Sequence, residues 1–205
     1  MPSLLLTGFE PFGDCETNPS WTVAERLHGL AVGNLVVVSR RLPVDGTRAP
    51  AALTGLIGEL EPAAAVMLGL AAGRFQVAVE RVAVNVLDYR IADNTGVTHT
   101  DIPVVATGPD AYLTSLPARA IVSAWREAGL PGCLSDSAGT FLCNQVFYTA
   151  RHALVQAGRG TVPAGFIHLP CDEALAHGKP RPYVPLEHQV QAVRVALAVV
   201  AASLG

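Results

Sequence analysis

Charged residues are scarce in this sequence. Asp, Glu, Lys and Arg make up 15% of its 205 residues, against about 25% in an average soluble protein. The net charge is -3 and Lys and Arg do not cluster, so the chain lacks the positive patch expected of a protein that binds nucleic acid or an anionic membrane. Half of the residues are hydrophobic, an excess that burial in a homo-oligomer would explain.

Long hydrophobic runs are also missing. The two longest, at 63–73 and 195–204, reach about ten residues, roughly half of what a membrane span requires. The first residues, MPSLLLTGFEPFG, carry no basic segment and only a short apolar stretch, which argues against a signal peptide. We therefore expect a cytoplasmic protein without a membrane segment.

Cysteine is sparse and never paired as CxxC. Cys15, Cys133, Cys143 and Cys171 should be free thiols in the cytoplasm, each to be judged singly. HLPC at 168–171 is too weak a signal for zinc without a second closely spaced pair. GFEPFG and GLAAGR match neither GxGxxG nor GxxxxGK[ST], so a nucleotide site is not expected.

What the sequence does contain is an alternation of short apolar runs with helical patterns, which is typical of βαβ units. It predicts one domain over residues 1–205, a three-layer α/β/α sandwich with a mostly parallel, twisted sheet. The second half of the 76–86 segment alternates more than the others, so that strand should lie at an edge or run antiparallel. Strands are expected at 3–8, 35–42, 64–70, 76–86 and 164–169, with 134–139 fitting a further one.

Helix ends are marked by caps and breakers. Asn18-Pro19 supplies an N-cap and a first-turn proline, and Gly29 supplies a stop. Further helices fit 47–60, 109–129, 141–157 and 187–204. In an open α/β sheet the loops between strand ends and helix starts form the binding crevice, and here these loops are 8–17, 87–103 and 170–185.

Cys143 falls at the start of the 141–157 helix, after the small-residue turn SAGT. The positive end of the helix dipole and unpaired N–H groups would favour a thiolate there, and a lowered pKa makes a cysteine nucleophilic. The alternative is a small buried hydrophobe, the commoner role of a single cysteine.

A thiolate nucleophile normally needs an imidazole and a group that orients it. Of the six histidines only His168 ends an apolar strand, GFIH, where parallel-sheet active sites lie; it could equally be a core histidine. Glu80 interrupts the apolar segment QVAVERVAVNV and would be costly to bury unpaired. A histidinium or a neighbouring arginine, Arg74 or Arg81, fits as its partner.

Several separated motifs together resemble pyroglutamyl peptidase I, the pyrrolidone carboxyl peptidase family. They are LLTGFEPFGDCETNPSW, GRFQVAVERVAVN, RIADNTG, SAGTFLCNQVFY and GFIHLP, which keep the family's order of Glu, Cys and His from about residue 3 to the end. The resemblance implies an enzyme, a cysteine peptidase that removes an N-terminal pyroglutamyl (5-oxoproline) residue from peptides through a thioester acyl-enzyme, without metal or cofactor. It also implies a homotetramer or dimer.

The resemblance assigns roles to individual residues. Cys143 is implied as the nucleophile, His168 as the general base and acid, and Glu80 as the residue that orients the imidazole. The Cys143 N–H and Arg90 are implied to stabilise the oxyanion.

For the lactam pocket, the resemblance implies Phe9, Phe12 and Asn18, with Leu70, where the family commonly has glutamine, as a main-chain contact. The competing hypothesis is a redox sensor without catalysis, in which Cys143 oxidises and Cys171 or Cys15 resolves it; it requires neither Glu80 nor the phenylalanines.

Overall fold

One seven-stranded sheet organises the computed structural model, which describes all residues, 1–205. The strand order is β2-β3-β1-β4-β9-β5-β8, with β1/β3, β1/β4, β4/β9 and β5/β8 parallel and β2/β3 and β5/β9 antiparallel. The bounds are β1 Ser3–Phe9, β2 Ala31–Val32, β3 Leu35–Leu42, β4 Ala64–Leu70, β5 Val77–Glu80, β8 Gly132–Ser135 and β9 Ala164–Leu169. The expected strands 3–8, 35–42, 64–70 and 164–169 are confirmed.

The segment expected as one strand at 76–86 is two strands in two sheets. β5 ends at Glu80, and β6 (Val82–Val84) pairs antiparallel with β7 (Ala111–Leu113) in a small second sheet. Arg81 is the transfer point, because its N–H donates to Ser135 of the large sheet and its carbonyl accepts from Thr114 beside β7. The expectation of an edge or antiparallel strand is thus confirmed by the antiparallel pairing of β6 with β7 and of β5 with β9, while β2 and β8 are the edges of the large sheet.

Two other expected boundaries were wrong. The helix expected at 109–129 begins only at Ala118, because its first part forms β7 and Pro117 precedes the helix. The strand expected at 134–139 begins at Gly132 and ends at Ser135, because the following SAG forms a turn with Gly139 at φ 79°. The short elements β2, β7 and α5 (Glu173–Ala176) have too few residues for a periodic pattern.

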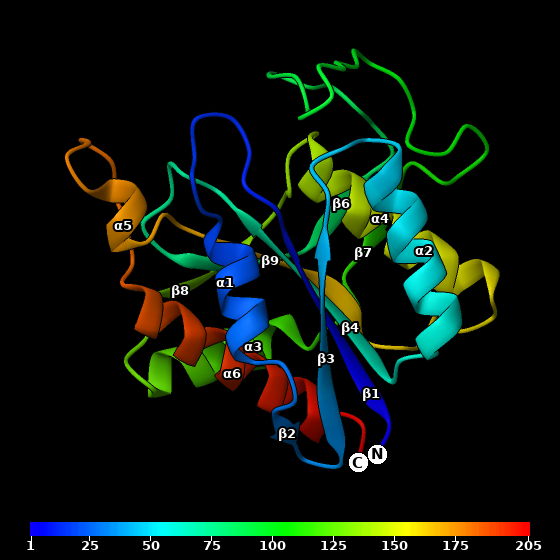
Figure 1. Ribbon diagram of the computed structural model, residues 1–205. Helices are drawn as coiled ribbons and strands as arrows, with labels where there is room; N and C mark the ends of the chain where they lie inside the picture. The colour runs from blue at the N-terminus through cyan, green and yellow to red at the C-terminus, as the bar shows by residue number, and fades with distance from the viewer.

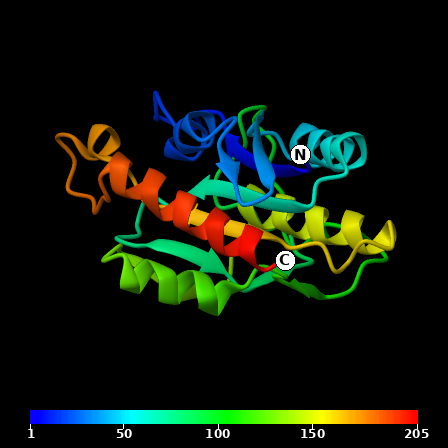
Figure 2. The same ribbon diagram turned by 90° about the horizontal axis from the view of Figure 1, so that it is seen from below.

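The helices form a layer on each side of the sheet. α1 (Pro19–Arg26), α3 (Ala118–Glu127) and α6 (Leu186–Ala202) cover one face, and α2 (Arg48–Leu60) and α4 (Leu142–Gln156) cover the other, as both views show (Figures 1 and 2). The Asn18 side chain accepts from the Ser20 N–H, as expected for the N-cap of α1. The three-layer α/β/α architecture is confirmed, and no helix is long and apolar enough to cross a membrane.

Alternation along β1 divides the apolar interior into two cores. Leu4 and Leu6 face the core beneath α1, α3 and α6, whereas Leu5 and Phe9 face the core beneath α2 and α4. All four are at most 3% exposed. The sheet is therefore covered on both faces, and exposed polar side chains can lie only at the ends of its strands. The loops that follow β1 and β6 rise above the same end of the sheet, at the top of Figure 1.

Candidate active site

Cys143 is the second residue of α4, directly above the sheet. The helix begins after its N-cap Phe141, which makes no side-chain capping hydrogen bond, so N–H groups of the first turn keep no helical partner. Cys143 as a residue is half-buried. A methyl group built on Gly69 of β4 would come within 2.8 Å of its sulfur, which means that the sulfur lies against the main chain of the sheet at Gly69.

His168 lies on the strand next to Gly69 and is held by Glu80. Gly69 and His168 are register partners across β4 and β9. The His168 Nδ1 lies 2.7 Å from Glu80 Oε1, and both side chains are buried, Glu80 completely. Since a carboxylate can only accept, Nδ1 carries the hydrogen and Nε2 is left free to accept a proton.

Glu80 pairs with an arginine as well as with the histidine. Arg74 Nη2 lies 3.0 Å from the same Oε1 atom, whereas Arg81 turns outward and pairs with the exposed Asp136 at 3.0 Å. Of the three partners that the sequence left open, a histidine and Arg74 contact Glu80, and Arg81 does not. The pairing explains how a carboxylate can lie among apolar neighbours, since a buried charge needs a partner.

The expected low pKa of the Cys143 thiol was wrong for this resting arrangement. Burial, followed by the negative charge of Glu80, raises its pKa to about 12, although its own N–H and the charge of Arg74 act in the opposite direction. Desolvation of a thiolate therefore outweighs the helix N-terminus. The sulfur would be a thiol at rest and would need a base to remove its proton during attack.

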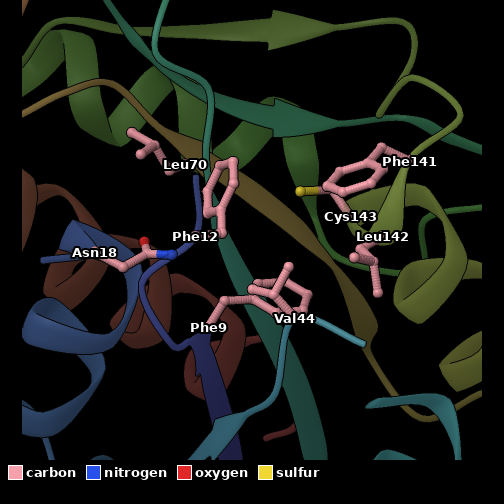
Figure 3. Close-up of a pocket in the computed structure, with 8 residues that line it drawn as sticks. All are labelled: Phe9, Phe12, Asn18, Val44, Leu70, Phe141, Leu142 and Cys143. Carbon is pink, nitrogen blue, oxygen red and sulfur yellow. The ribbon is translucent and has the colours of Figure 1, made fainter. Parts of the chain in front are cut away.

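An apolar pocket opens beside the sulfur. It encloses about 290 Å³ including its open mouth, and seven of its eight lining residues are hydrophobic. Figure 3 shows the Cys143 sulfur pointing from α4 toward Phe12 and Leu70. The lining residues are Phe9, Phe12, Asn18, Val44, Leu70, Phe141, Leu142 and Cys143. A flat, uncharged ring would fit such walls better than a charged side chain would.

The four expected pocket residues all line this cavity. Asn18 is the one polar member, and its Oδ1 already accepts from the Ser20 N–H and hydroxyl at 3.1 and 2.8 Å. Its Nδ2 donates to the Glu10 carbonyl at 2.9 Å. Asn18 thus serves as N-cap and fastens the loop that carries Phe12, which leaves one Nδ2 hydrogen for a ligand.

Arg90 is not brought into the pocket. Its side chain is exposed and makes no hydrogen bond or ion pair. Its neighbour Tyr89 is buried, however, with its ring 4.6 Å edge-on from Phe141 and its hydroxyl donating to Gln145 at 2.6 Å. The loop is therefore anchored close to Cys143 at Tyr89, with Arg90 just outside.

Three pocket residues and one charged residue were not singled out from the sequence. Phe141 and Leu142 directly precede Cys143 within the SAGTFLCNQVFY motif, and Val44 follows the carboxyl end of β3. The sequence signal for the first two was their position beside Cys143, and for Val44 its position after a strand end. Arg74 was considered only as an alternative partner of Glu80, because spacing does not show that Glu80 can contact two cations at once.

The remaining cysteines and histidines form no second cluster. Cys171 is buried, with its thiol 3.7 Å from the Ala72 carbonyl, and His152 Nδ1 lies 2.9 Å from the Tyr112 hydroxyl. No group of three or more His, Cys, Asp or Glu side chains could hold a metal ion. HLPC does not gather donors around His168, whose Nδ1 already contacts Glu80.

A cysteine at a helix start lies against Gly69, the register partner of a histidine that is held by a buried carboxylate. Such an arrangement is typical of a cysteine hydrolase. Comparison with known proteins agrees with this class. The family model described as pyroglutamyl peptidase matches residues 2–203. The chain therefore belongs to the pyroglutamyl peptidase family, and it is a hydrolase of the cysteine peptidase type.

Individual relatives match over almost their whole length. A pyrrolidone-carboxylate peptidase of Deinococcus radiodurans is 50% identical over 202 residues, covering 96% of this chain and 93% of the relative. The crystal structure of the Bacillus amyloliquefaciens pyroglutamyl peptidase I superposes with a TM-score of 0.94 at 35% identity, covering 98% of each chain. The Thermococcus litoralis pyrrolidone carboxyl peptidase gives 0.94 at 37% identity, covering 100% of this chain and 95% of the other. These matches support the enzyme and not the redox sensor.

Proposed function

We propose that this chain hydrolyses the amide bond after an N-terminal pyroglutamyl residue, with Cys143 as nucleophile, His168 as base and acid, and Glu80 as the orienting carboxylate. The proposal depends above all on the 2.7 Å contact between His168 Nδ1 and Glu80 Oε1. His168 is the register partner of Gly69, against which the Cys143 sulfur lies. The family match supports the substrate class, because the relatives are pyrrolidone-carboxylate peptidases.

The reaction starts with a proton transfer from Cys143 to His168. As the sulfur attacks the scissile carbonyl, its proton passes to Nε2, the ring nitrogen that does not contact Glu80. The imidazolium that forms is stabilised by the Glu80 carboxylate. Because burial raises the pKa of the Cys143 thiol, His168 would take the proton as the sulfur attacks.

The tetrahedral oxyanion forms above the start of α4. The N–H of Cys143 belongs to the uncapped first turn of the helix and would donate to the oxyanion, where such groups are most effective. Arg90 would add its charge from the loop anchored by Tyr89, after a rotation of its exposed side chain. His168 then protonates the leaving amine, the acyl group remains on the sulfur as a thioester, and water releases pyroglutamate. These steps use only protein groups and water.

The pocket supplies the preference for a lactam ring. Phe9 and Phe12 would form apolar walls, and the ring N–H and carbonyl would pair with the main chain at Leu70 and with the spare Nδ2 hydrogen of Asn18. The ring carries no charge, so the pocket needs no counter-ion. A free N-terminal amine would enter it as a cation and would be costly to desolvate there.

The natural partners would be peptides that begin with pyroglutamate. We also propose a homo-oligomer, a tetramer or dimer, because large apolar side chains are exposed on the single chain, among them Phe75 at 69% and Leu113 at 67%. Light scattering coupled to size-exclusion chromatography measures the oligomeric state, and a monomer at micromolar concentration would contradict this part.

The activity itself is tested with fluorogenic amides under reducing conditions. The protein is incubated with pyroglutamyl, prolyl and alanyl coumarin amides. We expect release from the pyroglutamyl amide only, with loss of release in Cys143→Ser and His168→Ala. Equal activity of Cys143→Ser, or equal cleavage of all three amides, would contradict the proposal.

A further inference from the structure

Arg74 is fixed beside the reacting groups by two contacts. Its Nη2 atom lies 3.0 Å from Glu80 Oε1 and 3.2 Å from the Ser135 hydroxyl. Glu80 and Ser135 are themselves register partners, at the ends of β5 and β8. The guanidinium therefore reaches from the loop between β4 and β5 across both strand ends.

The contact to Glu80 involves the same oxygen atom that His168 uses. Oε1 receives His168 Nδ1 at 2.7 Å and Arg74 Nη2 at 3.0 Å, whereas Oε2 is buried and has no partner. The Glu80 side chain is 0% exposed, so water does not replace either donor. The position and the charge balance of this carboxylate thus depend on both neighbours.

The charge of Arg74 also acts on the nucleophile. Glu80 raises the pKa of the Cys143 thiol after burial, and Arg74 lowers it. The other titratable groups facing this cluster are Cys133 on β8, which both charges influence, and Tyr89, which is coupled to Cys143. Besides the proton that His168 would take up, Arg74 is the only cation among these groups.

We propose that Arg74 is a positioning residue of the peptidase, which holds the Glu80 carboxylate toward His168 and balances its negative charge at Cys143. The inference depends on the catalytic roles proposed above. It follows from the shared oxygen, since an imidazolium forming on His168 needs the Glu80 charge, but the thiolate forming on Cys143 is repelled by it. Arg74 acts through Glu80 and is not among the pocket residues, so it should affect kcat more than KM.

The variants are chosen to separate charge from structure. Arg74→Met removes the cation and keeps the bulk, and Arg74→Lys keeps a charge but not the geometry. Ser135→Ala removes the second contact of Arg74 together with the 3.4 Å hydrogen bond from the Ser135 hydroxyl to the Ser137 carbonyl. Arg81→Met is the matched control, because Arg81 adjoins Glu80 in sequence but pairs with exposed Asp136 at the surface. Thermal melts compare the folding of all four.

The decisive measurement is the rate of iodoacetamide alkylation at Cys143 across the pH range, read by peptide mass spectrometry. Below the thiol pKa the alkylation rate rises about tenfold per pH unit, and loss of a nearby positive charge should move this rising part of the Arg74→Met profile to higher pH by roughly one unit. Since one unit is a tenfold change in thiolate fraction, kcat/KM near pH 7 should fall by about tenfold with KM nearly unchanged. Arg74→Lys and Ser135→Ala should show smaller changes in the same direction, and they also test the proposal if Arg74→Met does not fold.

Two results separate this inference from the proposed function. Profiles of Arg74→Met, Arg74→Lys and Ser135→Ala that coincide with those of the wild type and Arg81→Met would overturn the role of Arg74 alone. A His168→Ala profile that coincides with the wild type would show that His168 does not activate Cys143, and would overturn the catalytic roles on which the inference rests.

Discussion

Gly69 and Cys143 are in direct contact, with the sulfur resting where the side chain of any other residue would be. A Cβ atom at Gly69 would lie 2.8 Å from the sulfur and 2.6 Å from the ring of Phe166. Because Gly69 is the register partner of His168, the missing side chain allows the Cys143 sulfur to approach the strands next to His168. Glycine is therefore needed at this position so that the sulfur can lie close to the strand, and not because the backbone makes a turn.

Substitution of Gly69 by alanine should displace the sulfur. We expect kcat to fall by about 100-fold in Gly69→Ala, since a shift of about 1 Å in reacting groups has an effect of this size. Gly73→Ala is the control, because a Cβ there meets nothing within 4 Å. Steady-state kinetics and a thermal melt measure the two effects separately. Wild-type kcat in Gly69→Ala would show that the sulfur has other room.

Phe12 is predicted to bind the ring of the substrate without taking part in chemistry. It lines the pocket, with its ring 6.5 Å from that of Phe141. Phe12→Ala should raise KM about tenfold with kcat nearly unchanged, corresponding to a loss of about 1.4 kcal/mol of uniform binding. Tyr183→Ala, at a 50% exposed position, is the control. Unchanged kinetics in Phe12→Ala would remove Phe12 from the binding site.

Asp93 is predicted to hold the loop that carries Tyr89 and Arg90. Its carboxylate accepts from Gly46 N–H at 2.9 Å and from the Thr95 N–H, the Thr95 hydroxyl and Val97 N–H. Burial raises the pKa of Asp93, but these hydrogen bonds outweigh it and lower the pKa overall. An amide in Asp93→Asn would turn its NH₂ group toward the Gly46 or Thr95 donors, so we expect a loss of roughly 2 kcal/mol in unfolding free energy at pH 7.

The same prediction has a defined pH dependence. Because the folded-state pKa of Asp93 lies below its usual 3.8, the carboxylate stabilises the fold above that pH and loses this effect as the pH falls through the folded-state value. Urea unfolding at several pH values should show the difference between wild type and Asp93→Asn shrinking in acid. A difference that stays constant down to the lowest accessible pH would contradict this assignment.

Tyr148 should make the fold sensitive to alkali. It is fully buried, and its hydroxyl donates to the Pro109 carbonyl at 2.6 Å. Burial, with Tyr112 and Asp110, raises its pKa from 10.0 to about 12. A raised folded-state pKa stabilises the protein below pH 10, and this effect is lost as the pH rises toward 12. In denaturant titrations, Tyr148→Phe should therefore lose stability less steeply than the wild type above pH 10, although it should be less stable than the wild type at neutral pH. Tyr183→Phe, at a half-exposed position, is the control and should follow the wild type.

Long periodic segments and their caps were enough to predict the layered architecture. Ala64–Leu70 agrees with the expected strand bounds because a buried parallel strand is a continuous apolar run. Leu35–Leu42 also agrees, and it begins with such a run, LVVV, before the polar residues SRR. Ala111–Leu113 was predicted as helix because three residues carry no period of their own. Its strand conformation comes from pairing with Val82–Val84, a contact between segments distant in sequence.

The residues of the site were predictable by type and position, but their charge interactions were not. Cys143 and His168 stand at a helix start and a strand end, where sequence signals are strong. The direction of the thiol pKa was wrong because the depth of burial around Cys143 depends on packing of α4 against the sheet. The double pairing of Glu80 could not be predicted from the sequence either, because Arg74 and His168 are brought together by the position of β9 between β4 and β5.

The position of β9 in the sequence and in the sheet has a consequence for biosynthesis. The strand that carries His168 is the last to be translated, yet it occupies an inner place in the sheet between two strands made much earlier. Until β9 has been synthesised, a nascent chain on the ribosome contains Cys143 and Glu80 but not His168, and β5 has no sheet neighbour on that side. The contact between Glu80 and His168 can therefore form only after synthesis has passed β9.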